Sequence, residues 1–145
     1  MVRDVLVDTL LELMRVIRRR THPVRRGEMT PEQYGLLRRL DACGPLSVGD
    51  LAGRLGVSPS AATMACQRLE RQGLVSRVRS PEDERVVRVT LTPEGRQRVA
   101  QWRAARRELV AGLVEVLAPE EQVALTRLLR RILDHVEVTP GDAAR

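Results

Sequence analysis

The sequence predicts a mainly helical protein with one small β-hairpin wing, a winged helix-turn-helix with dimerisation helices at both ends of the chain. Three observations predict this fold class. Six segments carry helical periodicity or helix-start signals, two short ones among them are joined by a glycine turn, and a pair of strand-like segments follows that turn motif. A length of 145 residues fits one domain with helical extensions.

The first helix is predicted over residues 3–20, because apolar side chains recur there on one face at helical spacing. These side chains belong to Leu6, Leu10, Leu13, Met14 and Ile17. Three arginines at residues 18–20 close the helix, where cations interact favourably with the helix dipole. Residues 21–30 have the composition of a loop.

A second helix is predicted to begin after this loop. Thr30 and Gln33 have the spacing of a capping box, and Pro31 lies at the first helical position. Its inward face carries Tyr34, Leu37 and Leu40, and Gly44-Pro45 ends it.

Residues 47–72 predict the helix-turn-helix itself. Ser47 and Asp50 have capping-box spacing at the start of one short helix, and Ser58 followed by Pro59 starts the next. The two helices are expected to end near Leu55 and Gln72, with Gly56 at the turn, Gly73 as the stop and Ala52 as the small residue at the crossing. The positions expected to be buried are all apolar: Leu51, Leu55, Val57, Ala62 and Ala65.

A β-hairpin is predicted over residues 74–91, where the apolar period changes to two. Its strands are residues 74–79 and 85–91, and Val87, Val89 and Leu91 are expected on one face. Arg77, Arg79, Arg85 and Arg88 flank an acidic turn at residues 82–84. We expect Asp83 to hold the Arg85 guanidinium as a fork partner, and Glu82 and Glu84 only to make the loop soluble.

Two helices are predicted to complete the chain, and residues 139–145 are expected to fray. One begins at Thr92-Pro93-Glu94 and ends near Leu117, with an apolar stripe of Val99, Trp102, Leu109, Val110, Leu113, Val116 and Leu117. The other begins at Pro119, after the poor N-cap Ala118, with a stripe of Leu125, Leu128, Leu129, Ile132 and Val136.

A small winged domain cannot bury all of these stripes, so we expect residues 1–30 and 94–138 to dimerise and residues 31–93 to bind DNA. The alternative is an intramolecular three-helix pack.

The composition excludes several function classes. All 25 basic residues are arginine, so a Schiff-base lysine and a P-loop lysine are absent. Two cysteines and two histidines are too few for a zinc-finger framework, and the sequence has no catalytic arrangement of side chains. We therefore expect no enzyme activity, no cofactor and no metal. The net charge of +6 suits a polyanionic partner, although a GC-rich genome explains the choice of arginine over lysine.

The sequence has no secretory signal and no apolar run long enough to cross a membrane, which predicts a cytoplasmic protein without a membrane partner. Cys43 and Cys66 would then be reduced thiols. Cys66 falls on the buried side of its helix, and Cys43 lies at a helix C-terminus that disfavours a thiolate, so redox sensing is not favoured.

The helix over residues 59–72 would be the recognition helix, with the hairpin beside it. Gln67 has the geometry to pair with adenine, Arg68 with guanine or phosphate, and Ala61 or Thr63 could meet a thymine methyl group. The candidate DNA-binding residues are Ser58, Ser60, Ala61, Thr63, Met64, Gln67, Arg68, Arg71, Arg79, Asp83 and Arg85. The alternative is that Arg68 and Arg71 form a solvated face with Glu70.

Residues 30–137 resemble the MarR family of bacterial transcription regulators. The resemblance is carried by Arg68-Leu69-Glu70-x-x-Gly73-Leu74-Val75, Asp83-x-Arg85 and Leu91-Thr92-Pro93-Glu94-Gly95. It implies a homodimer whose first and last helices form the base and whose two winged modules bind a palindromic operator, with Asp83 and Arg85 at the minor groove. It also implies a ligand cavity between base and winged module, for which Arg18, His22, Met29 and Trp102 are candidates by location, each alternatively ordinary surface or core.

We therefore expect a homodimeric, sequence-specific regulator of double-stranded DNA, a repressor that a small-molecule effector releases. The alternative is a winged helix that serves as a protein-interaction module without sequence-specific DNA binding.

Overall fold

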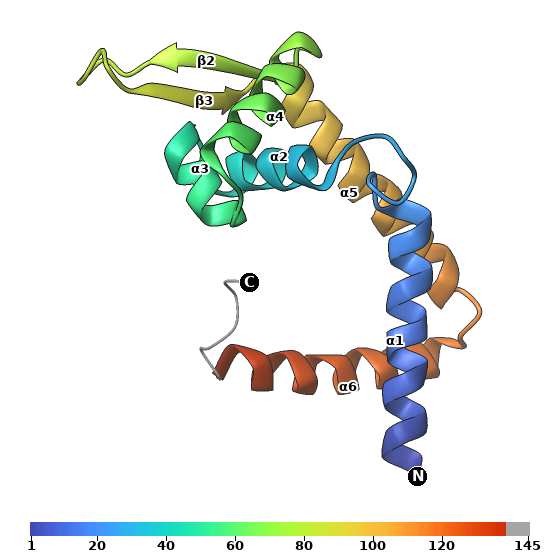
Figure 1. Cartoon of the computed structure of the whole chain (residues 1–145). Helices are drawn as coiled ribbons and strands as arrows, with labels where there is room; N and C mark the ends of the chain where they lie inside the picture. Colours follow the sequence, from blue (N-terminus) through green and yellow to red (C-terminus); the bar gives the residue numbers. More distant parts are fainter. Residues whose placement is uncertain (139–145) are drawn as a thin grey trace. The chain divides into compact units, whose positions relative to one another are not determined.

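The structure is a computed structural model that describes residues 1–138 (Figure 1). The elements are α1 (Val2–Thr21), α2 (Pro31–Cys43), β1 (Leu46–Ser47), α3 (Val48–Leu55), α4 (Pro59–Arg71), β2 (Val75–Arg79), β3 (Val87–Leu91), α5 (Pro93–Val114) and α6 (Pro119–Val138). The predicted order of helices and hairpin is confirmed. The frayed tail expected at residues 139–145 lies outside the described residues.

The chain forms two compact units, Met1–Arg107 and Glu108–Arg145. The first unit is built on a core that α2, α3, α4, the sheet and the first half of α5 share. Its largest fully buried side chains include Leu36, Leu37, Leu51, Leu69, Val75 and Val89. Val99 and Trp102 of α5 belong to the same core, so this unit continues well beyond residue 93, where the winged module was predicted to end.

The sheet has three antiparallel strands in the order β1-β3-β2, one more than predicted. The added strand β1 is only two residues long, too short to show a sequence period, and Leu46 pairs with Val89. Val87, Val89 and Leu91 alternate along β3 in an unbroken register with β2, so they share one face as predicted. Val89 and Leu91 are buried, whereas Val87 is 36% exposed.

Side-chain caps and glycine turns set the helix boundaries. The Thr30 hydroxyl accepts from the Gln33 amide and the Gln33 side chain accepts from the Thr30 amide, which confirms the capping box. Ser47 caps α3 through the bond from the Asp50 amide to its hydroxyl oxygen. Helix α4 ends at Arg71, and Gly73, two residues later, has a φ of +73° in the left-handed region. The chain therefore turns sharply from α4 into β2.

Helix α6, in the second unit, begins where predicted although Ala118 has no capping side chain. The Glu121 carboxylate accepts instead from the Ala118 amide at 2.8 Å, which is half of a capping box. Helix α5 ends at Val114, before the predicted Leu117, and Val116 is exposed.

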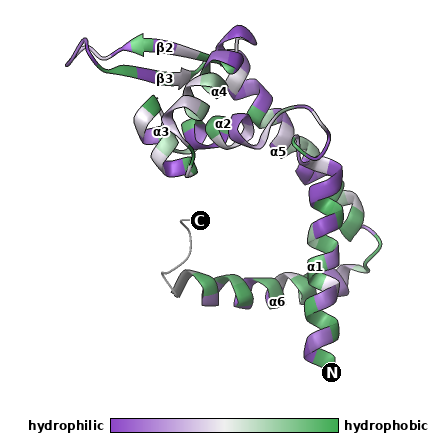
Figure 2. Cartoon of the chain, in the orientation of Figure 1, coloured by the Kyte–Doolittle hydropathy of each residue, from purple (hydrophilic) through white to green (hydrophobic). Residues whose placement is uncertain are grey.

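Large apolar side chains stay exposed on α1 and on α6, and green residues recur along both helices in Figure 2. Their exposed fractions lie between 40% and 87%. On α1 they are Val2, Val5, Leu6, Val7, Leu11, Leu13 and Met14, and on α6 they are Val123, Leu128, Leu129, Ile132, Leu133 and Val136. None of the helices in residues 1–138 is both long and apolar enough to cross a membrane.

Candidate functional site

Helix α4 has one buried face and one face that is free to meet a partner. Ser58 caps its first turn by accepting from the Ala61 amide at 3.1 Å, and Pro59 occupies the first helical position. The side chains packed into the core are Ala62, Ala65, Cys66 and Leu69. Ser60, Met64, Arg68 and Arg71 are exposed on the other side, and Ala61, Thr63 and Gln67 are partly exposed. The structure thus brings all the predicted helix residues to one end or one face of α4.

Helix α3 packs across α4 through the turn at Gly56. The φ of Gly56 is +65°, and the Val57 amide donates to the Ala52 carbonyl at 3.1 Å. A residue with a side chain is strained at this φ, which is why the helix-turn-helix has glycine here. The turn fixes the angle at which α4 is presented.

The arginines of α4 are not paired with Glu70. The Glu70 carboxylate accepts instead from Arg77 of β2 at 2.8 Å. Within residues 1–138, Arg68 and Arg71 form no ion pair with an acidic side chain. Glu70 therefore does not neutralise these arginines, and two exposed guanidinium groups on α4 keep their charge available to an anionic partner.

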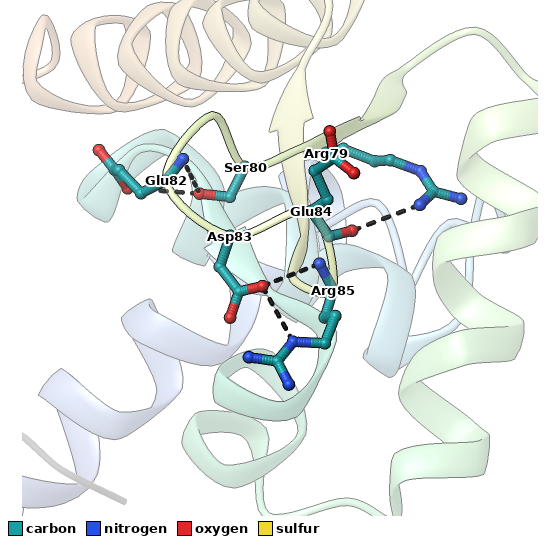
Figure 3. Close-up of polar contacts among 6 residues, drawn as sticks. All are labelled: Arg79, Ser80, Glu82, Asp83, Glu84 and Arg85. Carbon is teal, nitrogen blue, oxygen red and sulfur yellow. Dashed lines mark hydrogen bonds and ion pairs between the residues drawn. The ribbon is translucent and has the colours of Figure 1, made fainter.

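The wing presents Arg85 at its tip (Figure 3). One carboxylate oxygen of Asp83 accepts both from the Arg85 amide at 3.0 Å and from Arg85 Nε at 3.2 Å. The predicted pairing is confirmed, but it is not a fork, because Asp83 uses a single oxygen. The Arg85 side chain remains 89% exposed. Because Asp83 accepts only from the Nε of this side chain, the two terminal amino groups of Arg85 can donate elsewhere.

The other groups of the wing brace the turn. Arg79 donates to the Glu84 carbonyl at 3.3 Å, as Figure 3 shows, so part of its hydrogen-bonding capacity is internal. Glu82 was expected only to make the loop soluble, and this was wrong. Its carboxylate accepts from the buried Ser80 hydroxyl at 3.3 Å and pairs with Arg88 at 3.7 Å. The Arg85 side chain is therefore more exposed, at 89%, than those of Arg88 at 50% and Arg77 at 38%.

An open cavity of about 840 Å³ lies in the first unit, between α1, the following loop, α2 and α5. It is lined by Leu11, Met14, Arg15, Ile17, Arg18, Arg19, Thr21, His22, Arg25, Tyr34, Arg38 and Arg106. Six of these residues are arginines and none is acidic. The cavity therefore carries a positive potential that its own walls do not neutralise.

His22 and Tyr34 form the inner wall of this cavity. Their ring centroids are 4.2 Å apart, and Arg106 donates to the Tyr34 hydroxyl at 3.4 Å. Burial and then the nearby arginines, first Arg18 and Arg106, lower the pKa of His22 below the usual 6.5. Its Nδ1 accepts from the Val24 amide at 3.3 Å, which leaves Nε2–H as a donor in the neutral ring.

Comparison with known proteins identifies the family. The model of the MarR family matches residues 29–87. The HTH-type transcriptional repressor MdtR of Bacillus subtilis is 31% identical over 109 residues, which cover 75% of this chain and 70% of MdtR. Among solved structures, RV1404 from Mycobacterium tuberculosis is 33% identical with a TM-score of 0.76, covering 90% of this chain and 92% of that one.

The chain belongs to the MarR family. It is a DNA-binding transcriptional regulator and not an enzyme. The winged fold is shared with a MepR mutant from S. aureus bound to an oligodeoxyribonucleotide, at 23% identity and a TM-score of 0.72, covering 92% of this chain and 97% of that one. The helix-turn-helix and the Asp83–Arg85 pair lie within residues 29–87, so the matched segment includes the candidate interface.

The cavity of this MarR-family chain includes only two of the four residues predicted for a ligand. Arg18 and His22 line it. Trp102 is buried in the core, 5.5 Å from the Tyr34 ring, and Met29 packs against the same core, so neither lines the cavity. Most of the cationic lining was missed, because it comes from three segments far apart in the sequence whose meeting no local pattern reveals.

The two cysteines lie where expected. Cys66 is buried in the core of this MarR-family chain, and burial raises the pKa of its thiol, which opposes reactivity. Cys43 is exposed at the end of α2, and Arg54 approaches its sulfur at 3.6 Å. Within residues 1–138, no group of His, Cys, Asp and Glu side chains has the arrangement of a metal site.

Proposed function

We propose that this chain is a homodimeric repressor that binds a palindromic operator and is released by a small anionic effector. The observation that carries the proposal is that two surfaces with exposed arginines, one on α4 and one on the wing, lie in the same unit. Helix α4 exposes Arg68 and Arg71, which have no acidic partner among residues 1–136, and the wing exposes Arg85 at its tip. A helix of this kind fits the major groove, and a guanidinium held at a wing tip fits a narrow minor groove. The sequence-specific reading of DNA follows from the side chains along α4.

Residues 31–93 are assigned to DNA binding and residues 1–30 and 94–138 to dimerisation. The apolar faces of α1 and α6 are too large to stay in water, and each is exposed in the single chain. A second copy is the partner that would cover them with twofold symmetry, and two winged modules related in this way would read a palindrome. The oligonucleotide in the MepR structure supports the binding mode, and the repressor activity in the name of MdtR supports the direction of regulation.

The cationic cavity is the proposed effector site. An anion there would be attracted by guanidinium groups from α1, α2 and α5 and could accept from His22. Helix α2 faces the cavity with Tyr34 and Arg38 and packs Leu36 and Leu37 into the core beneath α4. A shift of α2 on binding would therefore reach the recognition helix.

Citrate is a small polyanion that suits this cationic cavity. It should raise the melting temperature of the chain, and the rise should be smaller in Arg18→Ala.

The experiment that tests DNA recognition uses a duplex selected by the protein from random sequences. Arg68→Ala and Arg85→Ala should each weaken its binding by about 1–3 kcal/mol in fluorescence anisotropy, provided the contact is base-directed. Arg98→Ala, at an exposed arginine of α5 outside the proposed interface, is the matched control and should bind normally. Unchanged binding in both interface variants contradicts the proposal.

Salt dependence separates the proposal from a winged helix that binds only other proteins. The logarithm of the DNA affinity should fall steeply with the logarithm of the salt concentration, because phosphate contacts release counterions. Genomic DNA that competes poorly, together with a flat salt response, would favour the protein-interaction module.

A further inference from the structure

The recognition helix α4 carries an apolar side chain at the centre of its outward face. Met64 is 54% exposed, while Ala62 and Cys66 on either side of it in sequence are buried. Two residues along a helix rotate by roughly 200°, so their side chains point about 160° apart. Met64 therefore projects away from the core, midway along the outward face that it shares with Ser60 and Arg71.

The neighbours of Met64 on the helix surface are polar or small. Ser60 and Arg68 lie one turn before and one turn after it, and Ala61 and Gln67 lie three residues away on either side. In a major groove, the central outward side chain reaches the floor of the groove and its neighbours reach the sides. Met64 is thus placed to meet base edges, whereas Arg68 is also within reach of phosphates.

The chemistry of methionine limits what it can read on a base edge. Its sulfur is only a weak acceptor and it has no donor, so it cannot pair with the polar atoms that distinguish most bases. The 5-methyl group of thymine is the large apolar feature of the major groove. The unbranched side chain of methionine adapts its shape to such a surface.

We propose that Met64 reads the 5-methyl group of a thymine near the centre of each operator half-site and so determines base preference there. The inference rests on the proposed DNA-binding function. It assigns the apolar contact to the centre of the helix face, because Thr63 lies to one side and Ala61 has only a short methyl group that is partly covered.

The test removes only the methyl group from the DNA. In the selected duplex, each thymine is replaced in turn by deoxyuridine, and the affinity of the full chain is measured by fluorescence anisotropy. Replacement of the one contacted thymine in a single half-site should lower the affinity about three- to fivefold, the usual effect of losing one buried methyl group. If no single thymine methyl group affects binding, the inference is wrong.

Variants of the protein identify the residue responsible. In Met64→Ala, the sensitive thymine and deoxyuridine should be bound equally well, while Met64→Leu should keep a preference for thymine because it keeps apolar bulk. Thr63→Ser removes the competing methyl group and should leave the preference unchanged. A preference that survives in Met64→Ala but is lost in Thr63→Ser overturns the assignment.

These outcomes are distinct from failure of the proposed function. A protein that selects a duplex and loses affinity in Arg85→Ala, but ignores thymine methyl groups, contradicts only the role of Met64. A protein that selects no duplex contradicts both. Because Met64 is exposed, its substitution leaves the core intact, and circular dichroism of Met64→Ala should match that of the unaltered chain.

Discussion

At the scale of single residues, the orientation of the Arg85 side chain depends on the neighbouring carboxylate of Asp83. Asp83 adds a negative charge near the proposed DNA surface, which by itself would repel phosphate. Its carboxylate nevertheless holds both the amide and the Nε of Arg85, and so fixes the direction of an otherwise freely rotating side chain. Orientation and charge repulsion act in opposite directions, and substitution decides which is larger.

We expect Asp83→Ala to weaken DNA binding, although it removes a negative charge, because the Arg85 side chain loses its only internal partner among residues 1–138. Glu84→Ala is the matched control. It removes the same charge from the same turn, but only its backbone carbonyl takes part in the turn, so binding should be unchanged or tighter. Fluorescence anisotropy with the selected duplex measures both, and tighter binding by Asp83→Ala would show that charge outweighs orientation.

His22 links the cavity to pH. Its folded-state pKa is lowered by burial and by Arg18, Arg106, Arg25 and Arg38, so the unfolded chain binds a proton more readily than the folded chain. The folded state therefore favours the neutral imidazole of His22. The stability that this preference contributes is fully present above the unfolded pKa of 6.5 and is lost as the pH falls through the lower folded pKa.

The free energy of unfolding should therefore decrease as the pH is lowered from 7 towards 5. In His22→Gln, which cannot titrate, the decrease should be smaller over the same range. Urea unfolding at each pH and at one protein concentration measures the difference. Identical slopes in both proteins would show that His22 does not contribute to the pH dependence of stability.

At the scale of elements, the approach of α5 to the start of β2 depends on Gly95. A methyl group at this position would overlap the backbone carbonyl of Leu74, and backbone atoms cannot move aside as the end of a side chain can. The same junction is held by the Thr92 hydroxyl, which donates to the Gly73 carbonyl at 2.5 Å and accepts from the Gly95 amide at 3.0 Å. The segment that leaves α4, the start of β2 and the start of α5 thus meet at one close contact.

Gly95→Ala should destabilise the fold by about 1–3 kcal/mol, the usual cost of overpacking, despite the better helix propensity of alanine. Gly53→Ala in α3 is the control, because a methyl group there meets nothing within 4 Å. It should leave stability unchanged or raise it by up to about 1 kcal/mol. Urea unfolding of the two variants compares them, and equal stabilities would mean that the junction relaxes without cost.

At the scale of the whole molecule, the exposed apolar side chains of α1 and α6 are the surfaces that the proposed dimer would cover. Ile132→Glu would place a charge within such a face and should produce a monomer that retains its helical content. Arg130→Glu, on the same helix, changes charge without entering the apolar face and should remain a dimer. Light scattering after size-exclusion chromatography measures the mass, and a monomeric unaltered chain would contradict the proposal.

Monomeric Ile132→Glu should also bind the selected duplex much more weakly, because two half-sites no longer cooperate through one dimer. A single winged module would retain its contacts with a half-site. Affinity equal to that of the unaltered chain would mean that dimerisation does not contribute to recognition.

The sequence predicted the winged module well because its signals are local. Capping residues such as Thr30 and Ser58, glycine stops such as Gly73, and the period of two before Leu91 each depend on a few neighbouring residues. The outward face of α4 and the Asp83–Arg85 pair follow from the same short-range spacing. By contrast, β1 was missed because two residues show no period, and the contacts of Glu82 with Ser80 and Arg88 depend on the course of the turn.

The sequence by itself thus determined the order of the elements, the outward face of α4 and the arginine of the wing tip, because spacing along one helix or one hairpin fixes which side chains share a face. Only the tertiary structure decided that Trp102 belongs to the core, that Glu70 pairs with Arg77, and that arginines from α1, α2 and α5 line one cavity. These features join residues far apart in the chain, and their proximity is set by how the elements pack, which no local period encodes.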